Sequence, residues 1–344
     1  MSHEHASELT DWFAHVQRDF PWRKDRTAYR VLVSEIMLQQ TRAAAVVAFY
    51  ERWIKRFPDF LTLSKASDLD VIKFWEGLGY YSRARNLKQI AIAVMEKFNG
   101  EFPSSYENIL SFKGIGVYTA AAISHFAFNK RAIGADGNIN RVIARFYGYT
   151  ERVDRKGGVL HLLDQFIPAK RSDQTFEALI ELGATICTKK PKCIECPLRD
   201  GCKAFQEELQ SVIPVIKQKP KIQTLNRIVF IIEVNGSVVI KRECRNLMKG
   251  LYEFPYLEED SSINQLGVIE SLFLCRLKKT CEHKKVVHYF TKYKAVLSPI
   301  TCAVFGSITL PDGYELICKE KLGELPFSSG HKKIRLQDNS LCSI

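Results

Sequence analysis

Apolar side chains recur at helical spacing through the first part of the chain, from residue 8 to about residue 207. Within this region an apolar residue returns every three or four positions, and Gly or Pro separates one run from the next. The pattern predicts helices over 28–40, 43–56, 68–75, 83–98, 117–127, 138–147 and 174–186. We therefore expect an all-α architecture for this part of the chain.

The pattern changes after residue 212. The segment 213–226 contains two prolines and three lysines and has no apolar face, which is typical of a linker. A β-branched run over 227–234, the turn dipeptide Asn235-Gly236 and a second run over 237–242 together predict a β-hairpin. Further strands are predicted over 285–298 and 300–306, so we expect an α+β domain over 227–344.

Size and charge narrow the class of protein. The chain has 344 residues, which is enough for two or three domains, and its net charge of +12 indicates a polyanionic partner such as nucleic acid. A basic soluble protein without such a partner would carry the same charge. The first ten residues are polar, and no apolar run approaches the roughly 18 residues of a membrane helix. We expect neither a signal peptide nor a membrane partner.

Four of the ten cysteines gather in one segment, with the spacing Cys187-x5-Cys193-x2-Cys196-x5-Cys202. Thiolates are soft ligands, and four of them so close in sequence can hold one iron–sulfur cluster or one zinc ion. A second CxxC pair is missing, which disfavours a zinc finger but leaves a structural zinc site open. The remaining cysteines are scattered and are expected to be free thiols in a reducing compartment. Basic residues that suit contact with phosphate surround the segment: Lys189, Lys190, Lys192, Arg199 and Lys203.

A glycine-rich turn precedes the Ala-rich segment 117–127. Lys113, Gly114 and Gly116 stand immediately before the predicted helix. Glycines in this position let the backbone approach a phosphate, and the helix N-terminus adds free N–H groups and a positive dipole end. This arrangement is typical of a helix-hairpin-helix, although a tight turn between two helices has the same local sequence.

Two carboxyl groups stand in settings that suit acid catalysis. Glu35 lies within the apolar segment 31–38, where desolvation should raise its pKa and make it a general acid near neutral pH. A buried glutamate paired with arginine or backbone would have the same neighbours. Asp136 precedes the predicted helix 138–147, where its commonest role is that of an N-cap. Alternatively it stays ionised and faces a developing positive charge, a division of labour typical of glycosidic bond cleavage.

Several motifs taken together resemble one family. They are Pro21-Trp22-Arg23, the stretch 33–41, the stretch 77–87, the Gly114 and Gly116 turn, Asp136-Gly137-Asn138, the cysteine segment and the stretch 250–255. In this combination the chain resembles the A/G-specific adenine DNA glycosylases. The resemblance covers nearly the whole chain, and it implies a base-excision enzyme that removes adenine opposite 8-oxoguanine or guanine in double-stranded DNA.

The resemblance implies roles for individual residues. Glu35 corresponds to the acid that protonates adenine and then handles the nucleophilic water. Asp136 corresponds to the carboxylate that stabilises the oxocarbenium-like sugar, and Asn138 would orient that site. Trp22 and Arg23 would line the adenine pocket.

Adenine must leave the base stack before it is cut, so side chains must fill the gap. By the resemblance, Tyr80 and Gln40 intercalate and fill the gap, with Leu38 nearby, although Tyr80 could equally be a packed loop aromatic. Tyr118 stands where related glycosylase/lyases carry a lysine. Because a phenol cannot form a Schiff base, we expect a monofunctional enzyme.

The fold implied by the resemblance is multidomain. A helical glycosylase region over 1–212 would contain a six-helix, helix-hairpin-helix module over about 22–130. The N-terminal segment and about 131–212 would form a module that holds one [4Fe–4S] cluster on Cys187, Cys193, Cys196 and Cys202. A linker over 213–226 and a Nudix-like lesion-recognition domain over 227–344 would follow. We expect a monomer of bacterial type that acts on the nucleoid in the cytoplasm.

The chain departs from the family pattern in three places: the cysteine spacing, the residue before the hairpin and the lesion-sensing loop. Five residues rather than six separate Cys187 from Cys193, and Lys113 replaces a proline before the hairpin. No Glu-rich Nudix box follows residue 250, so pyrophosphate hydrolysis is not expected. The lesion-sensing Phe-Ser-His loop becomes Phe290-Thr291-Lys292.

This altered loop suggests a difference in specificity. His288 precedes the loop, and Thr291 keeps a hydroxyl that could contact 8-oxoguanine. Lys292 keeps a hydrogen-bond donor but lacks a planar ring. We expect weaker discrimination between A·8-oxoguanine and A·G than in the family, with Lys292→His widening the gap. An ordinary solvated strand end remains the alternative.

Overall fold

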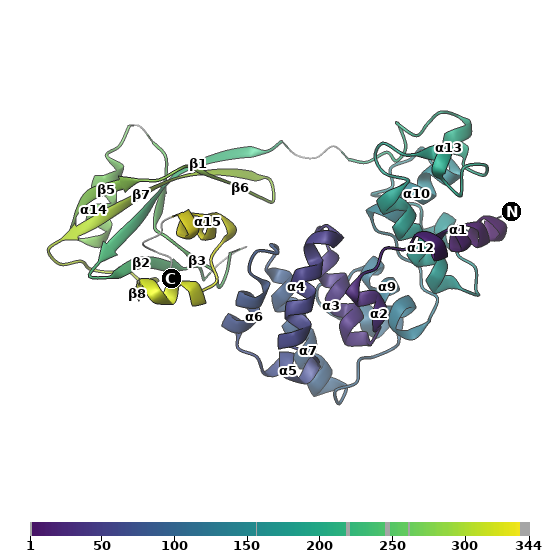
Figure 1. The fold of residues 1–344 in the computed structure, drawn as a ribbon, viewed down its shortest axis with the longest axis horizontal. Coiled ribbons are helices and arrows are strands. Elements are labelled where there is room, and N and C mark those ends of the chain that lie inside the picture. Colours follow the sequence, from purple (N-terminus) through teal and green to yellow (C-terminus); the bar gives the residue numbers. More distant parts are fainter. Residues whose placement is uncertain (1, 156, 218–220, 245–247, 261, 338–344) are drawn as a thin grey trace. The chain divides into compact units, whose positions relative to one another are not determined.

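The computed structural model describes residues 2–155, 157–217, 221–244, 248–260 and 262–337 (Figure 1). The chain divides into two compact units. The first, called here the helical unit, comprises Met1–Lys65 and Asn86–Gln218. The second, called here the sheet unit, comprises Ala66–Arg85 and Lys219–Ile344. The sheet unit therefore includes one helical segment from the first part of the chain.

The helical unit is built from helices throughout its described residues, as the apolar periodicity predicted. Its helices are α1 (Ser2–Val16), α2 (Pro21–Lys24), α3 (Ala28–Leu38), α4 (Ala43–Arg56), α5 (Phe60–Lys65), most of α7 (Ser82–Lys97), α8 (Tyr106–Ser111), α9 (Val117–Phe128), α10 (Gly137–Tyr147), α11 (Leu160–Phe166), α12 (Ser172–Thr185), the 3-10 turn η1 (Cys193–Glu195) and α13 (Lys203–Gln206). Each helix predicted in this unit is confirmed within a few residues. The short helices α5, α8 and α11 and the polar helix α1 were not predicted.

The core of the helical unit brings the functional segments together. Helix α3 packs on α9, and α12 packs on both α10 and α1. Leu9 and Phe13 of α1 share this core with Phe166 and Phe176. As a result, α3 meets α9, and Glu35 of α3 interacts electrostatically with Asp136 at the start of α10.

Among its described residues, the sheet unit contains an eight-stranded sheet with the order β3-β2-β1-β7-β5, in which β4 also pairs with β1, β6 with β7 and β8 with β2. The strands are β1 (Gln223–Val234), β2 (Ser237–Arg242), β3 (Tyr252–Glu253), β4 (Tyr256–Glu258), β5 (Arg276–Glu282), β6 (Val286–Phe290), β7 (Tyr293–Phe305) and β8 (Tyr314–Cys318). The long strands β1 and β7 run parallel, and the other pairs are antiparallel. The unit also holds α6 (Asp68–Trp75), α14 (Gln265–Phe273), the 3-10 helix η2 (Lys319–Glu324) and α15 (Ser329–Gln337).

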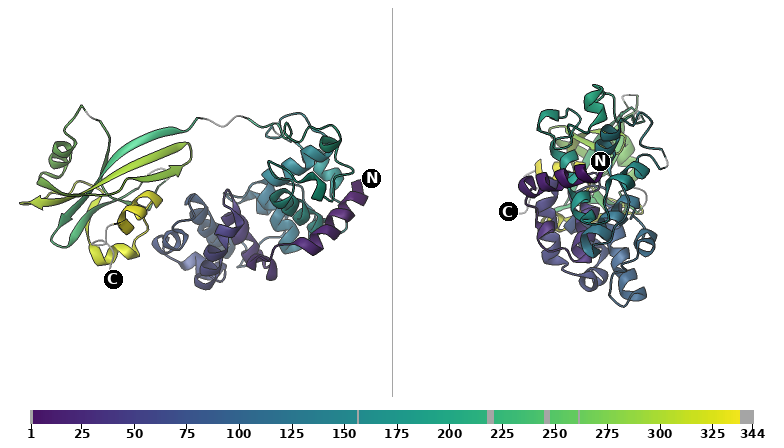
Figure 2. Two further views of the ribbon diagram at one scale, coloured as in Figure 1. Left: turned by 45° about the horizontal axis from the view of Figure 1, so that its top comes forward. Right: turned by 90° about the vertical axis from the view of Figure 1, so that its right-hand side faces the viewer.

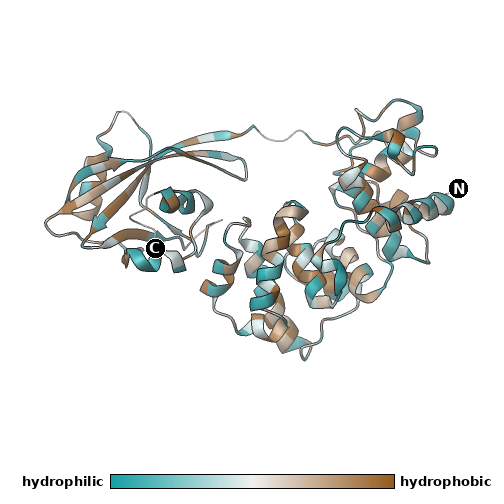
Figure 3. Cartoon of the chain, viewed as in Figure 1, coloured by the Kyte–Doolittle hydropathy of each residue, from teal (hydrophilic) through white to brown (hydrophobic). Residues whose placement is uncertain are grey.

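Alternating residues of β1 build a core on each face of the sheet. Val229 and Ile231 pack in the cluster that includes Ile334 of α15. Phe230 and Ile232 pack in the cluster that includes Ile269 and Phe273 of α14. Because successive strand residues point to opposite faces, one strand serves both cores, with α15 on one face and α14 on the other (Figure 1; Figure 2). Figure 3 shows the resulting apolar residues along the strands.

The predicted hairpin is confirmed, since β1 and β2 pair across Asn235 and Gly236, which have φ angles of 46° and 77°. The prediction of one strand over 285–298 is wrong, because the chain turns at Thr291 and Lys292 between β6 and β7. Thr291 has a φ angle of 47°, which the sequence does not signal with Gly or Asn. The strand expected over 300–306 continues β7, and β1 begins at Gln223 within the expected linker.

None of the helices in the described ranges combines the length and the hydropathy that a bilayer-crossing helix requires.

Candidate active site

Glu35 lies on the buried face of α3 and is 6% exposed. Burial raises the pKa of its carboxyl to about 8, and the nearby carboxyl of Asp136 adds to the increase. This agrees with the expectation from the apolar sequence around it. Since the pKa lies above neutrality, Glu35 carries a proton at pH 7 and can act as a general acid.

Tyr118, in the first turn of α9, forms a hydrogen bond with the Glu35 side chain. The ring of Tyr118 stacks on Phe176 with centroids 5.9 Å apart, which fixes its orientation. Burial and the neighbouring Glu35 raise the pKa of Tyr118 well above its usual value. Among the described residues, the Oε2 atom of Glu35 is buried and has no hydrogen-bond partner. The carboxyl therefore keeps one oxygen available for a reaction partner.

Asp136 is the N-cap of α10, and the charge of its carboxyl raises the pKa of Glu35. Its carboxyl accepts hydrogen bonds from the backbone N–H groups of Asn138 at 2.9 Å and Ile139 at 2.8 Å, and from Asn138 Nδ2 at 3.0 Å. The role of a helix N-cap is thus compatible with the alternative role of a carboxylate that faces a developing positive charge. Burial raises the pKa of Asp136, while the hydrogen bonds from the backbone N–H groups of Ile139 and Asn138 oppose this increase. The Asp136 carboxyl accepts three hydrogen bonds, whereas Oε2 of Glu35 has no partner among the described residues.

Asn138 is held in turn by Arg141, a residue that the sequence did not single out. Arg141 Nη2 donates to Asn138 Oδ1 at 2.8 Å, and Arg141 Nε donates to the carbonyl of Cys187 at 2.6 Å. Gly183 approaches so closely that a Cβ there would lie 2.6 Å from Asn138 Cβ. These contacts fix the amide that donates to Asp136.

A second unpredicted feature is an ion-pair network whose Glu177 and Arg26 act electrostatically on Glu35. Glu177 of α12 pairs with Arg23 at 2.8 Å and with Arg26 at 2.6 Å. Arg23 also pairs with Glu181 at 2.8 Å. Arg23 thus lies among carboxylates, and its expected role in an adenine pocket stays a prediction. Trp22, for which the same role is expected, is buried and stacks on a neighbouring aromatic ring with centroids 4.7 Å apart.

The hairpin expected to contact phosphate has two different glycines. Gly114 has a φ angle of 95°, and a Cβ there would lie 2.4 Å from Asn86 Nδ2. Gly116 is the N-cap of α9, and a Cβ there would meet open space. Gln39 donates to the Gly114 carbonyl at 3.3 Å and ties the turn to the end of α3. Lys113 is exposed beside this turn.

The four cysteines of the central segment line one cavity together with Arg145. Arg145 Nη1 lies 3.4 Å from Cys187 Sγ. Within the described ranges, no group of three or more His, Cys, Asp or Glu side chains is placed to hold one metal ion. A four-iron cluster gives each thiolate its own iron, so its ligands stand farther apart than those of a single zinc ion. The donor set and the shared cavity fit a cluster.

The residues expected to enter the DNA stack are found at exposed, strained positions. Gln40 follows α3, is exposed and has a φ angle of 56°, while Leu38 is the half-buried last residue of that helix. Tyr80 lies between α6 and α7, is 47% exposed and has a φ angle of 50°. Positive φ at residues other than glycine is uncommon and clusters at functional sites.

A cavity of about 670 Å³ within the sheet unit brings Tyr80 together with most of the predicted sensing loop. His288, Phe290 and Thr291 line it opposite Tyr80. Lys292 is exposed and does not line this cavity, and its Nζ lies 5.3 Å from the centroid of the Tyr293 ring. Of these two polar residues of the sensing loop, Thr291 lines the cavity and Lys292 does not.

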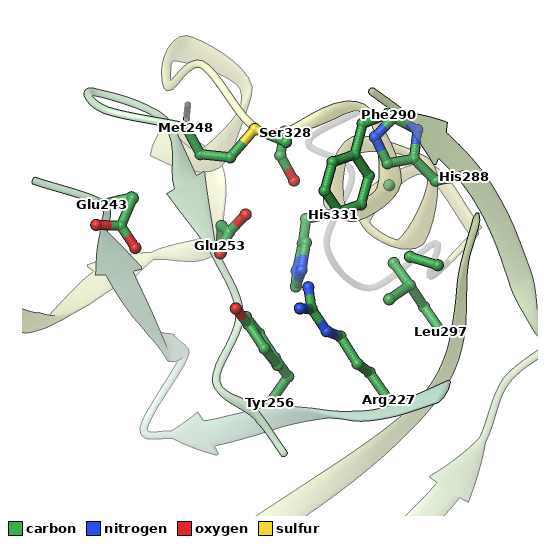
Figure 4. Close-up of a pocket in the computed structure, with 12 residues that line it drawn as sticks. Arg227, Glu243, Met248, Glu253, Tyr256, His288, Phe290, Leu297, Ser328 and His331 are labelled. Atoms are coloured by element: carbon green, nitrogen blue, oxygen red, sulfur yellow. The ribbon is translucent and has the colours of Figure 1, made fainter. Parts of the chain in front are cut away.

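A second cavity of the sheet unit, of about 230 Å³, was not predicted (Figure 4). Arg227, Tyr256, His331 and Phe290 line it, and Figure 4 shows His331 between Arg227 and Phe290. Burial and the neighbouring Arg227 lower the pKa of His331 to about 3, and its Nδ1 accepts a hydrogen bond from the Phe254 N–H at 3.0 Å. His331 is therefore neutral and fixed at neutral pH.

Comparison with known proteins decides the family. Residues 33–169 match the model of the HhH-GPD superfamily of base excision DNA repair proteins. An adenine DNA glycosylase of Buchnera aphidicola subsp. Baizongia pistaciae is 34% identical over 85% of this chain and 82% of its own length. The chain belongs to the adenine DNA glycosylase family. The adenine DNA glycosylase of Homo sapiens is 28% identical, over 95% of this chain and 72% of its own length.

The enzyme is thus a base-excision DNA glycosylase that acts on DNA, with a helix-hairpin-helix core followed by an α+β sheet unit. A solved structure of a thermostable thymine-DNA glycosylase matches 60% of this chain and 97% of its own, with a TM-score of 0.56 and 29% identity. A non-covalent endonuclease III–DNA complex matches the same share of this chain with a TM-score of 0.53 and 22% identity, and this likeness concerns the fold alone.

Proposed function

We propose that this enzyme hydrolyses the N-glycosidic bond of adenine placed opposite 8-oxoguanine or guanine in duplex DNA, acting as a monomer and without strand cleavage. The observation that carries the proposal is the buried Glu35, whose pKa of about 8 makes it an acid at neutral pH, beside Asp136 and Tyr118. Two carboxyl groups so arranged can divide the work of glycosidic cleavage.

Each step follows from the chemistry of adenine release. The base must leave the stack, and Tyr80 and Gln40 would fill the space that it vacates. Glu35 would then donate its proton to adenine N7, which makes the base a better leaving group. As the bond breaks, positive charge develops on the sugar, and the carboxylate of Asp136, oriented by Asn138, would stabilise it. The ionised Glu35 would finally accept a proton from the attacking water.

The absence of a lyase step rests on Tyr118. A lyase needs an amine to form a Schiff base at the sugar, and Tyr118 offers a phenol whose pKa is raised further by burial. Its hydrogen bond to Glu35 gives it a different role, which is to hold the acid in place.

We also propose one [4Fe–4S] cluster on Cys187, Cys193, Cys196 and Cys202. Supporting it are the cavity that these cysteines share and the softness of their four thiol ligands. The cluster would supply a rigid link between α12 and α13, and the lysines of the segment would contact phosphate. Iron analysis of brown, purified protein should give about four iron atoms per chain, whereas one zinc atom would refute the cluster.

The sheet unit would recognise the base opposite adenine, as a Nudix-like domain without pyrophosphatase activity. Support comes from the cavity that joins Tyr80 to His288, Phe290 and Thr291. The Thr291 hydroxyl can donate to or accept from a base edge, so it suits an altered purine.

One assay tests the catalytic proposal. A labelled duplex with adenine opposite 8-oxoguanine is incubated with the enzyme and then heated with alkali, with a thymine–guanine duplex as the substrate control. Cleavage that needs alkali supports a monofunctional adenine glycosylase. Cleavage before alkali would show a lyase, and cutting of only the thymine duplex would overturn the substrate. Glu35→Gln should lose activity in the same assay.

A further inference from the structure

Glu76, which follows α6, is a buried carboxylate that catalysis does not use. It is 6% exposed. Its Oε1 accepts the backbone N–H of Phe327 at 2.9 Å, and its Oε2 accepts Lys332 Nζ at 3.0 Å and Lys73 Nζ at 3.2 Å. Lys73 Nζ donates further to two carbonyls of the segment 323–325. A single carboxylate therefore joins α6 to a segment 251 positions away in sequence.

The charge of Glu76 is maintained despite its burial. Burial by itself would raise its pKa, but the Phe327 N–H and the Lys332 and Lys73 ammonium groups outweigh this and lower the pKa. Glu76 is thus ionised at neutral pH. Removing one partner of a buried, hydrogen-bonded ion pair is strongly destabilising, because the other charge is left uncompensated. The groups bonded to Glu76 are therefore costly to separate from it.

The loop directly after Glu76 carries Tyr80. Within this loop, Trp75 Nε1 donates to the Gly79 carbonyl at 3.0 Å, and Arg83 Nη2 donates to the same carbonyl at 3.1 Å. Tyr81 accepts the Gly77 N–H at 3.3 Å and hydrogen-bonds with Ser329. The loop is therefore fixed internally and is tied at both of its ends to the segment 327–332.

The segment 327–332 also contacts the hairpin formed by β6 and β7, called here the sensing hairpin, whose turn holds the predicted sensing residues Thr291 and Lys292. A Cβ on Gly330 would lie 2.7 Å from Leu297 Cδ1 and 3.4 Å from His288 Cβ, so α15 packs tightly on β6 and β7. Ser328 and His331 line the smaller cavity together with His288 and Phe290 (Figure 4). One short segment thus contacts the Tyr80 loop on one side and the sensing hairpin on the other.

We propose that Glu76 is a positioning residue for base recognition. It holds the Tyr80 loop and the β6–β7 hairpin at a fixed separation across the segment 327–332, so that the cavity between them keeps the shape that selects the base opposite adenine. The inference rests on the proposed function, in which this cavity recognises that base. Glu76 itself does not line the cavity.

Glu76→Gln tests the link with little change in shape. The glutamine oxygen can still accept the Phe327 N–H, but its amide cannot accept a hydrogen bond from Lys332 or Lys73. We expect the ratio of single-turnover rates on A·8-oxoguanine and A·G duplexes to fall about tenfold, which is within the usual range for coupling between sites. The rate on A·G should fall less, because guanine lacks the C8 oxygen that the cavity is proposed to recognise in 8-oxoguanine.

Glu259→Gln is the matched control. Glu259 is exposed in the same unit, so the substitution removes the same charge without touching the Tyr80 loop, and it should leave the ratio unchanged. Lys332→Met is a second variant, which spares the bonds of Glu76 to Phe327 and Lys73 and covers the case in which Glu76→Gln fails to fold. The two substitutions should be non-additive in the double variant, because they remove one shared interaction.

The outcomes separate the inference from the function on which it rests. If the wild-type enzyme does not prefer A·8-oxoguanine over A·G, the proposed recognition fails. If the wild type has this preference and both variants keep the ratio, the positioning role is overturned. A parallel fall of both rates together with a lower melting temperature would assign Glu76 to stability alone, which also overturns the inference.

Discussion

The buried acid Glu35 should make the enzyme less stable as the pH rises, and Glu35→Gln should remove this effect. In the folded state its pKa is about 8, against 4.5 for an ordinary glutamate. The folded protein therefore favours the protonated form, while the unfolded chain ionises freely above pH 4.5. Stability is unaffected below the unfolded pKa, is lost progressively between the two values, and is lowest above pH 8.

The size of the effect follows from the two pKa values. At about 1.4 kcal/mol per pH unit, the difference between 4.5 and about 8 corresponds to a loss of about 5 kcal/mol above pH 8. At about pH 7 the loss is about 3 kcal/mol, because part of the titration is still to come. A glutamine side chain cannot ionise, so the Glu35→Gln variant should keep its stability over the same range while losing catalysis.

Thermal unfolding followed by circular dichroism measures this difference. The wild type and Glu35→Gln should melt within a few degrees of each other near about pH 5, whereas the variant should melt about 10 °C higher near about pH 8.5. Glu96→Gln, at an exposed position of α7, controls for the loss of a carboxylate. If the gap between wild type and Glu35→Gln were the same at both pH values, the raised pKa of Glu35 would be refuted.

Three further predictions follow from the same structure. Gly114→Ala forces a side chain onto Asn86 at a φ angle of 95°, and should cost about 1–3 kcal/mol in urea unfolding, whereas Gly116→Ala should cost almost nothing; equal losses would contradict the geometry. In the proposed reaction, Tyr118→Lys places an amine beside the sugar and should produce a borohydride-trapped DNA adduct that the wild type lacks, so its absence from an active variant would argue against the proposed position. Thr291→Val should lower the A·8-oxoguanine to A·G rate ratio about fivefold through the loss of one hydrogen bond, while Lys292→Ala, outside the cavity, should not; the reverse pattern would restore Lys292 as the sensing residue.

The helices were predictable where their apolar periodicity is strong. Helices such as α4 and α10 repeat an apolar residue at each turn, and their predicted bounds agree closely with the structure. Helix α1 is polar in its first turns, and its buried residues Leu9 and Phe13 are secured by contacts with α12 and α11, which the local sequence does not encode. The resemblance placed a loop at Thr291 and Lys292, but the strand pattern did not predict the turn. The turn lacks glycine, asparagine and proline, and the β-branched residues on either side suggest one long strand.

The burial of Glu35 was predictable from local sequence, but the residues around it were not. The apolar stretch around Glu35 implies burial, and burial implies a raised pKa. Arg23 and Glu177 lie 154 positions apart in sequence and meet only because α2 and α12 pack in one unit. No local pattern distinguishes Glu177 from an exposed helix glutamate. Glu76 was missed for the same reason, since its partner Phe327 enters the unit from the end of the chain.

The placement of Arg141 changes how the cysteine segment relates to catalysis. Asp136 accepts from Asn138, Asn138 accepts from Arg141, and Arg141 donates to the carbonyl of Cys187, so hydrogen bonds run without a break from the Asp136 carboxyl to the first cysteine. Arg141 is also partly buried, and a guanidinium in that setting is held by all of its acceptors together. A cluster that fixes Cys187 would therefore also fix the amide that orients Asp136, although it lies outside the reaction itself. The short loop between Cys187 and Cys193 then bears on the geometry of the carboxylate as well as on contacts with DNA.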